Sequence, residues 1–307
     1  MSIARSQFLA NLAGIGQAIN LEPLAQGAMG TSLPPGIFVL RRGVLVASLI
    51  ALETFVRERT VEVLRNLERW PKSFEDLPEK LRLAARLDAL SYLHNFARML
   101  KRQGDDFEAE VQAEITKMAS GHGTVQQFTK FVAGDYTGNL SDSGLKDLLA
   151  SLQVSDCWTT FRAFSAEIGL GVPSVQEVVK GIVRKRHRSA HSATYAPTAT
   201  EVSSLQDDLL CIALCFDVSI SASLEQAIAM ADDWALGRCS WRAGVILYIA
   251  KPYDRRMRLY KYGQSRALRI ANQVGDFRAL IPRPPAGQIA VLVEQNASAR
   301  PHTWQIL

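Results

Sequence analysis

A continuous helical pattern from about Phe38 to Arg69 constrains the fold of this chain more than any other stretch. Trp70 and Pro71 end it, because a proline cannot continue a helix. Its early part is apolar on nearly all sides, whereas a surface helix is apolar along one stripe. The pattern therefore predicts a long helix that is buried on several sides.

Helical periodicity continues through most of the chain, and the following ranges are expected to be helical: 5–20, 78–100, 107–119, 145–152, 158–168, 175–191, 205–216 and 224–236. From Trp241 the pattern changes to β-branched and aromatic runs, which predict strands at 241–250, 257–262 and 289–294. Pro252-Tyr253-Asp254 is typical of a hairpin turn. The expected fold is mainly α, with a helical domain over residues 1–236 and a small basic β-rich module over residues 237–307.

The charge is distributed unevenly along the sequence. Residues 1–235 hold 23 Lys+Arg and 27 Asp+Glu, whereas residues 236–307 hold 12 and 3, a net charge of +9. A basic segment of this kind indicates a polyanionic partner such as RNA, although its cations could also serve solubility alone. The aromatic residues among these cations suit single-stranded nucleic acid binding, but we expect most of them to be core.

Several functional classes find no support in the sequence. No run of 18 apolar residues occurs and the N-terminus lacks the pattern of a secretion signal, so no membrane span is expected. The four cysteines form no CxxC pair and indicate buried thiols in a reducing cytoplasm. Walker, Rossmann and zinc-ligand motifs are absent, so neither a cofactor nor a metal is expected.

A basic cluster closes one of the predicted helices. Ser174 is its candidate N-cap, with Glu177 as the capping-box partner. The last turns hold Arg184-Lys185-Arg186-His187-Arg188 and then His191. Such a cluster can be a solvated helix end, since cations favour that position. It can also be a phosphate-handling site, because arginine forks onto phosphate oxygens and histidine exchanges protons near neutrality.

Arg186-His187-x-x-x-His191 resembles the Arg-x4-6-His motif of HEPN domains, with the polar residue often found after the arginine. Residues 40–56 are similar to the first long helix of the subgroup related to ribonuclease L and PSP-associated HEPN domains. Gly138-Asn139-Leu140-Ser141 is similar to a later landmark of that subgroup. The resemblance covers residues 36–220 and implies a HEPN-like all-helical bundle, many examples of which are metal-independent endoribonucleases.

The resemblance also implies roles for particular residues. His191 would be the acid or base, Arg186 would hold the phosphorane, and His187 would orient its neighbours. Arg184, Lys185 and Arg188 would line the RNA path, although the spacing of Arg184 from His191 also fits the motif. Glu53, in the first long helix, would support the catalytic arginine or histidine.

The family leaves the biological role open. It implies a homodimer that places two motifs across one cleft, and by analogy a bacterial toxin or anti-phage effector with an antitoxin or defence partner. Other HEPN proteins are inactive scaffolds that bind nucleotides, RNA or proteins. HEPN toxins can also be silenced when a partner enzyme transfers a nucleotide to them.

Overall fold

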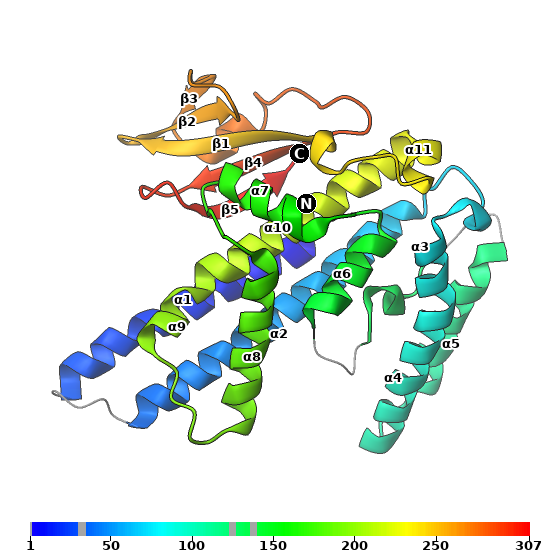
Figure 1. The fold of residues 1–307 in the computed structure, drawn as a ribbon, viewed down its shortest axis with the longest axis horizontal. Helices are drawn as coiled ribbons and strands as arrows, with labels where there is room; N and C mark the ends of the chain where they lie inside the picture. Colours follow the sequence, from blue (N-terminus) through cyan, green and yellow to red (C-terminus); the bar gives the residue numbers. More distant parts are fainter. Residues whose placement is uncertain (1, 30–34, 123–126, 136–139) are drawn as a thin grey trace.

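The computed structural model describes residues 2–29, 35–122, 127–135 and 140–307, and Figure 1 shows their arrangement. It is mainly helical with a small mixed sheet near the C-terminus, which confirms the coarse fold class expected from the sequence. The helices are α1 (Ile3–Met29), α2 (Pro35–Leu67), α3 (Glu79–Leu83), α4 (Ala89–Gln103), α5 (Glu108–Ala119), α6 (Asp142–Ser151), α7 (Cys157–Glu167), α8 (Val175–His191), α9 (Ala199–Ser203), α10 (Leu205–Ala229) and α11 (Ala231–Ala235). The strands are β1 (Val245–Tyr253), β2 (Arg256–Lys261), β3 (Arg269–Ala271), β4 (Ile289–Gln295) and β5 (Pro301–Ile306).

Helix α2 is the long helix expected at 38–69, and it is buried on several sides as predicted. It packs against α1, α8 and α10, and Leu45, Leu49 and Leu52 are almost fully buried. Figure 1 shows α1, α2 and α10 as long neighbouring rods with α8 crossing them. This arrangement fixes the position of α8, which bears the basic cluster.

Helix α10 differs from the expectation of two helices at 205–216 and 224–236. It runs unbroken to Ala229, and only the five-residue α11 follows. The serines in the intervening stretch do not interrupt it, because each finds a partner inside the fold. Ser219 Oγ donates to Phe216 O (2.9 Å), and Ser223 Oγ donates to Leu152 O and accepts from Trp234 Nε1.

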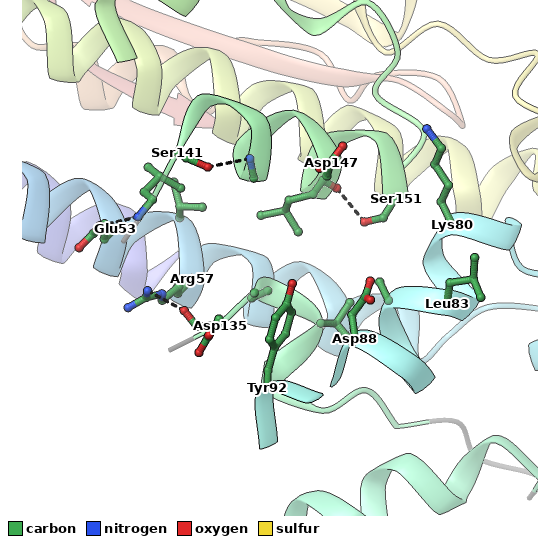
Figure 2. A pocket seen from close by; sticks show the side chains of 18 residues that line it. Glu53, Arg57, Lys80, Leu83, Asp88, Tyr92, Asp135, Ser141, Asp147 and Ser151 are labelled. Carbon is green, nitrogen blue, oxygen red and sulfur yellow. Dashed lines mark hydrogen bonds between the residues drawn. The ribbon is translucent and has the colours of Figure 1, made fainter. Parts of the chain in front are cut away.

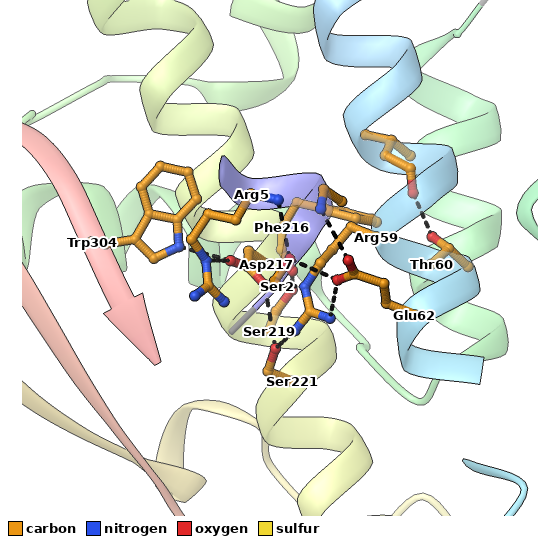
Figure 3. A network of polar contacts seen from close by, with 12 residues as sticks. Ser2, Arg5, Arg59, Thr60, Glu62, Phe216, Asp217, Ser219, Ser221 and Trp304 are labelled. Carbon is orange, nitrogen blue, oxygen red and sulfur yellow. Dashed lines mark hydrogen bonds and ion pairs between the residues drawn. The ribbon is translucent and has the colours of Figure 1, made fainter. Parts of the chain in front are cut away.

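A buried carboxylate connects four elements of the fold, as Figure 3 shows. Asp217 on α10 accepts from Arg5 Nε of α1 (2.5 Å) and Arg59 Nε of α2 (2.6 Å). It also accepts from Trp304 Nε1 of β5 at 2.7 Å. Burial alone would raise the pKa of Asp217, but the charges of Arg59 and Arg5 outweigh it and lower the pKa from 3.8 to about 2.

The sheet has the strand order β3-β2-β1-β4-β5, with β1 and β4 parallel and the other neighbours antiparallel. The expected hairpin is confirmed: Tyr253 of β1 pairs with Arg256 of β2, and Asp254 in the turn between them has φ +52°. Strands β3 and β5 were not predicted. They are short or begin with a proline, so the sequence around them shows little strand pattern.

The sheet shares its core with the helices. Leu247, Val291 and Trp304 belong to the same apolar cluster as α2 and α10, whereas the opposite face packs on Phe277 and the chain around it. The change at residues 236–237 is therefore a change of secondary structure within a continuous core.

By length and composition α2 could span a membrane, since an 18-residue window has a mean hydropathy of 1.7, although 44% of that window is buried in the fold. Among the described helices it alone passes this test. Three charged residues of α2 are buried and bound inside the protein: Arg41 to Glu22, Glu53 to Leu140 N, and Arg59 to Asp217. These contacts are those of a core helix.

Candidate nucleic-acid site at the end of helix α8

Helix α8 has the start and the end that the sequence predicts. Ser174 is the N-cap, and its Oγ accepts a hydrogen bond from Glu177 N at 3.2 Å. The helix ends at His191, where Ser192 N donates to Arg188 O at 2.9 Å. The basic cluster therefore occupies the last two turns, where cations interact favourably with the helix dipole.

Four of the predicted site residues share one exposed face of α8. At about 100° per residue, positions 184, 187, 188 and 191 fall within an arc of about 100°. Arg184, His187, Arg188 and His191 are all exposed. The rings of His187 and His191 lie 4.7 Å apart between centroids, with 48° between their planes. We call these four residues the α8 face.

The other two cations of the cluster point elsewhere. Arg186 is offset by about 140° from His191 around the helix and lies on the side of the buried Val179 and Ile182. It is half-buried, and its Nε atom is buried with no hydrogen-bond partner in the described structure. Lys185 is also half-buried and interacts electrostatically with Glu201 and Asp208. Of the two arginines at allowed spacing, Arg184 is the one on the imidazole side.

Contacts that sequence reasoning missed hold the end of α8 in place. The guanidinium of Arg188 lies 4.0 Å from the ring centroid of Tyr195, whose hydroxyl donates to Glu201 Oε1 at 3.0 Å. Arg41 and Arg42 of α2 donate to backbone carbonyls of the following loop, at Pro197 (2.7 Å) and Ala193 (2.6 Å). The only sequence signal for these roles was the Arg-Arg pair at the start of an apolar helix.

Glu53 lies away from the α8 face. Its Oε1 accepts from Leu140 N at 2.6 Å, ahead of α6. Arg42, which contacts the loop after α8, is eleven residues earlier in α2, a distance of about 16 Å along a helix. The predicted supporting carboxylate is thus bonded to the α6 side of the fold. Gly138 and Asn139, which precede Leu140 in the segment that resembles HEPN domains, lie outside the described residues.

Glu53 lines a cavity of about 580 Å³ between α2, α4 and α6 (Figure 2). A π-helical stretch at Ala84–Asp88 joins α3 to α4 and forms part of its wall. Burial, and then the charges of Asp88, Asp135 and Asp147, raise the pKa of Tyr92. The cavity mixes both signs of charge, because Arg57 and Lys80 also line it.

The described residues contain no group of three or more His, Cys, Asp or Glu side chains placed to hold a metal ion. The α8 face offers two proton-exchanging groups beside two permanent cations, which can bind a phosphodiester and move protons on it. No protein-family model, curated protein or solved structure matches this chain. Membership of the HEPN family therefore stays a prediction, and function must be argued from the site itself.

Proposed function

We propose that this chain is a metal-independent endoribonuclease of the HEPN type, which cleaves RNA by attack of the 2′-hydroxyl on the adjacent phosphorus. The observation that supports it best is the pair of exposed imidazoles on α8, 4.7 Å apart, on a face shared with Arg184 and Arg188. The ion pairs of the described residues include neither arginine, so both guanidinium groups are available to a phosphate.

The reaction needs an acid and a base but no external nucleophile. One imidazole takes the proton of the 2′-hydroxyl as the bond from the 2′-oxygen to phosphorus forms. The other imidazole, protonated, gives its proton to the 5′-oxygen as the bond from phosphorus to that oxygen breaks. The products are a 2′,3′-cyclic phosphate and a free 5′-hydroxyl. His187 and His191 can fill these two roles because their rings are neighbours and their side chains are exposed.

The arginines on the same face would stabilise the negative charge that develops on the pentacoordinate phosphorus. Arg184 is one helical turn from His187, and Arg188 is held by its stacking on Tyr195. We therefore assign the phosphate-binding role to Arg184 in preference to Arg186, whose side chain leans towards the helical core.

A scaffold that binds RNA without cutting it is the second candidate. The α8 face is open to solvent, and none of its residues lines the cavity beside Glu53. An open face binds a polyanion readily, but it excludes little water from a reacting phosphate. A homodimer with two α8 faces across one cleft, which we include in the proposal, would supply the missing wall. Its mass in solution would be twice the 33.8 kDa of the chain.

The test is incubation of purified protein with single-stranded RNA in EDTA, followed by analysis of the product ends. We expect fragments that end in a 2′,3′-cyclic phosphate. His187→Ala and His191→Ala should each lower the rate by at least about 100-fold. His94→Ala, at an exposed histidine of α4, is the matched control and should cut like the wild type. Intact RNA with binding retained would favour the scaffold; full activity in either α8 variant would reject the mechanism.

A further inference from the structure

A second cationic surface lies on the β1–β2 hairpin. In a strand, alternate side chains point to the same face, and the register pairs Lys251 with Arg258 and Ile249 with Tyr260. The following six residues therefore share one face of the hairpin, which we call the hairpin platform: Lys251, Tyr253, Arg256, Arg258, Tyr260 and Tyr262. Figure 1 shows β2 and β3 at the edge of the sheet that is farther from the helices, and along β1 the same face continues into Ile249, which packs on the helical core.

The aromatic residues of the hairpin platform are accessible. Tyr253 is 39% exposed and Tyr262 is 45% exposed, and Tyr260 between them is partly exposed. The expectation that most aromatic residues of this segment are core holds for Trp241, Tyr248 and Phe277, which are buried. The platform tyrosines are the exceptions, and all of them are on the hairpin.

The cations of the hairpin platform differ from other cations of the C-terminal segment. Arg242 pairs with Glu167 and Arg300 pairs with Asp207, so these two fasten the sheet to the helices. The ion pairs of the described residues include none with Lys251, Arg256 or Arg258. The hairpin itself has one acidic residue, Asp254, in its turn. Among the described residues, these three cations thus have no carboxylate partner in an ion pair.

Cations and rings are interleaved at contact distance. The guanidinium carbon of Arg258 lies 3.2 Å from the ring centroid of Tyr253, and Arg258 Nε is buried with no hydrogen-bond partner. Lys251 Nζ lies 5.5 Å from the ring centroid of Tyr260. Stacking on the cations holds the rings in place, and a guanidinium donates hydrogen bonds to phosphate oxygens.

We propose that the hairpin platform binds single-stranded RNA, with bases stacked on Tyr253, Tyr260 and Tyr262 and phosphates on Arg256, Arg258 and Lys251. Unpaired positive charge fits the charge of the phosphate backbone, and exposed rings fit unstacked bases. The choice of RNA rests on the proposed function, and the platform would hold a substrate that the α8 face cuts.

The experiment measures binding separately from cleavage. Fluorescence anisotropy of a labelled 2′-O-methyl oligouridine of about 12 nucleotides reports binding of a ligand that cannot undergo the transesterification. We expect Tyr260→Ala to weaken binding about tenfold, and Tyr260→Phe to bind like the wild type. A plot of the logarithm of the binding constant against the logarithm of salt concentration has a negative slope. Arg256→Ala and Lys251→Ala each remove one phosphate contact and should make this slope shallower by about 0.7.

Arg278→Ala is the matched control, because it removes an exposed cation next to Phe277, which packs on the opposite face of the sheet. Equal weakening in this control, or unchanged binding in Tyr260→Ala with a folded protein by circular dichroism, overturns the proposal. His94→Ala, at an exposed histidine outside both cationic surfaces, should bind the oligonucleotide like the wild type. Cleavage that persists without platform binding rejects this inference alone, whereas platform binding without cleavage of natural RNA rejects the proposed nuclease alone.

Discussion

Arg184 and Arg186 cannot be distinguished by the motif in the sequence, but the structure of α8 distinguishes them. Both fit the motif spacing to His191, but only Arg184 shares the exposed face of the imidazoles. We expect Arg184→Ala to lower the rate of RNA cleavage about 100-fold, because it removes a cation aimed at the developing charge. Arg186→Ala should lower the rate less than about tenfold. Single-turnover cleavage rates of the two variants test this assignment. A larger loss of rate in Arg186→Ala than in Arg184→Ala would assign the phosphate-binding role to Arg186.

The ionised carboxylate of Asp217 contributes to the stability of the fold. Asp217→Asn removes the negative charge between two buried arginines, and breaking a buried ion pair costs about 3–5 kcal/mol. Urea unfolding at pH 7 measures this loss. Asp233→Asn, whose exposed carboxylate pairs with Arg238 at 3.6 Å, is the control and should change stability by less than about 1 kcal/mol.

The pH dependence of this contribution has a definite sign. The pKa of Asp217 is about 2 in the folded protein and 3.8 in the reference state, so its charged form is favoured by folding. The stabilisation is fully present above pH 3.8 and is lost as the pH falls towards 2. The difference in unfolding free energy between wild type and Asp217→Asn should shrink over that range. A constant difference would contradict the assignment.

At the scale of the element, α8 is defined by local signals. Ser174→Ala removes the N-cap hydrogen bond and should destabilise the protein by about 1 kcal/mol, or about 2 °C in melting temperature. Calorimetry measures this shift, and Ser155→Ala at an exposed position serves as the control. Because the cap lies almost three helical turns from Arg184, its nearest neighbour on the α8 face, cleavage below the transition should be unchanged.

The elements that the sequence predicted well are those specified by nearby residues. The cap at Ser174, the end of α2 before Pro71 and the hairpin turn at Asp254 depend on residues within a few positions, and all were found. The failures depend on distant partners. The unbroken α10 relies on Arg59 of α2 and on Leu152 just after α6, which form hydrogen bonds with its serines.

The contrast between nearby and distant determinants also explains which features of the candidate site were predicted. Residue types identified the α8 cluster, but helix packing decides that Arg186 turns inwards while Arg184 stays exposed. Glu53 was expected to support the catalytic residues, yet its partner Leu140 is 87 residues away in the sequence. No local pattern encodes such a contact. The motif therefore identified the helix that bears the candidate site, but only the packed structure shows which of its residues are exposed.

At the scale of the whole molecule, the sheet and the helices share one apolar core. Trp304 of β5 contacts Phe8 of α1 and Phe55 of α2, with ring centroids 6.4 and 6.3 Å away, and its Nε1 donates to Asp217. A deletion of residues 237–307 would remove this tryptophan and expose the surface of α10 beneath it. Point substitutions on the hairpin platform are therefore the better test of RNA binding.

Trp304 also allows the unity of the fold to be tested directly. Trp304→Ala should destabilise the protein by about 3–5 kcal/mol, because it opens a cavity between α1, α2 and β5. Trp304→Phe should cost less, since it keeps most of the apolar volume but loses the hydrogen bond to Asp217. Unfolding in urea is followed by far-ultraviolet circular dichroism for the helices and by pulsed amide hydrogen exchange of β1 and β4 for the sheet. If the core is continuous, both signals change at one denaturant concentration, and each variant moves them together. A helical signal that keeps its wild-type midpoint in Trp304→Ala would show instead that the helical body folds without the sheet.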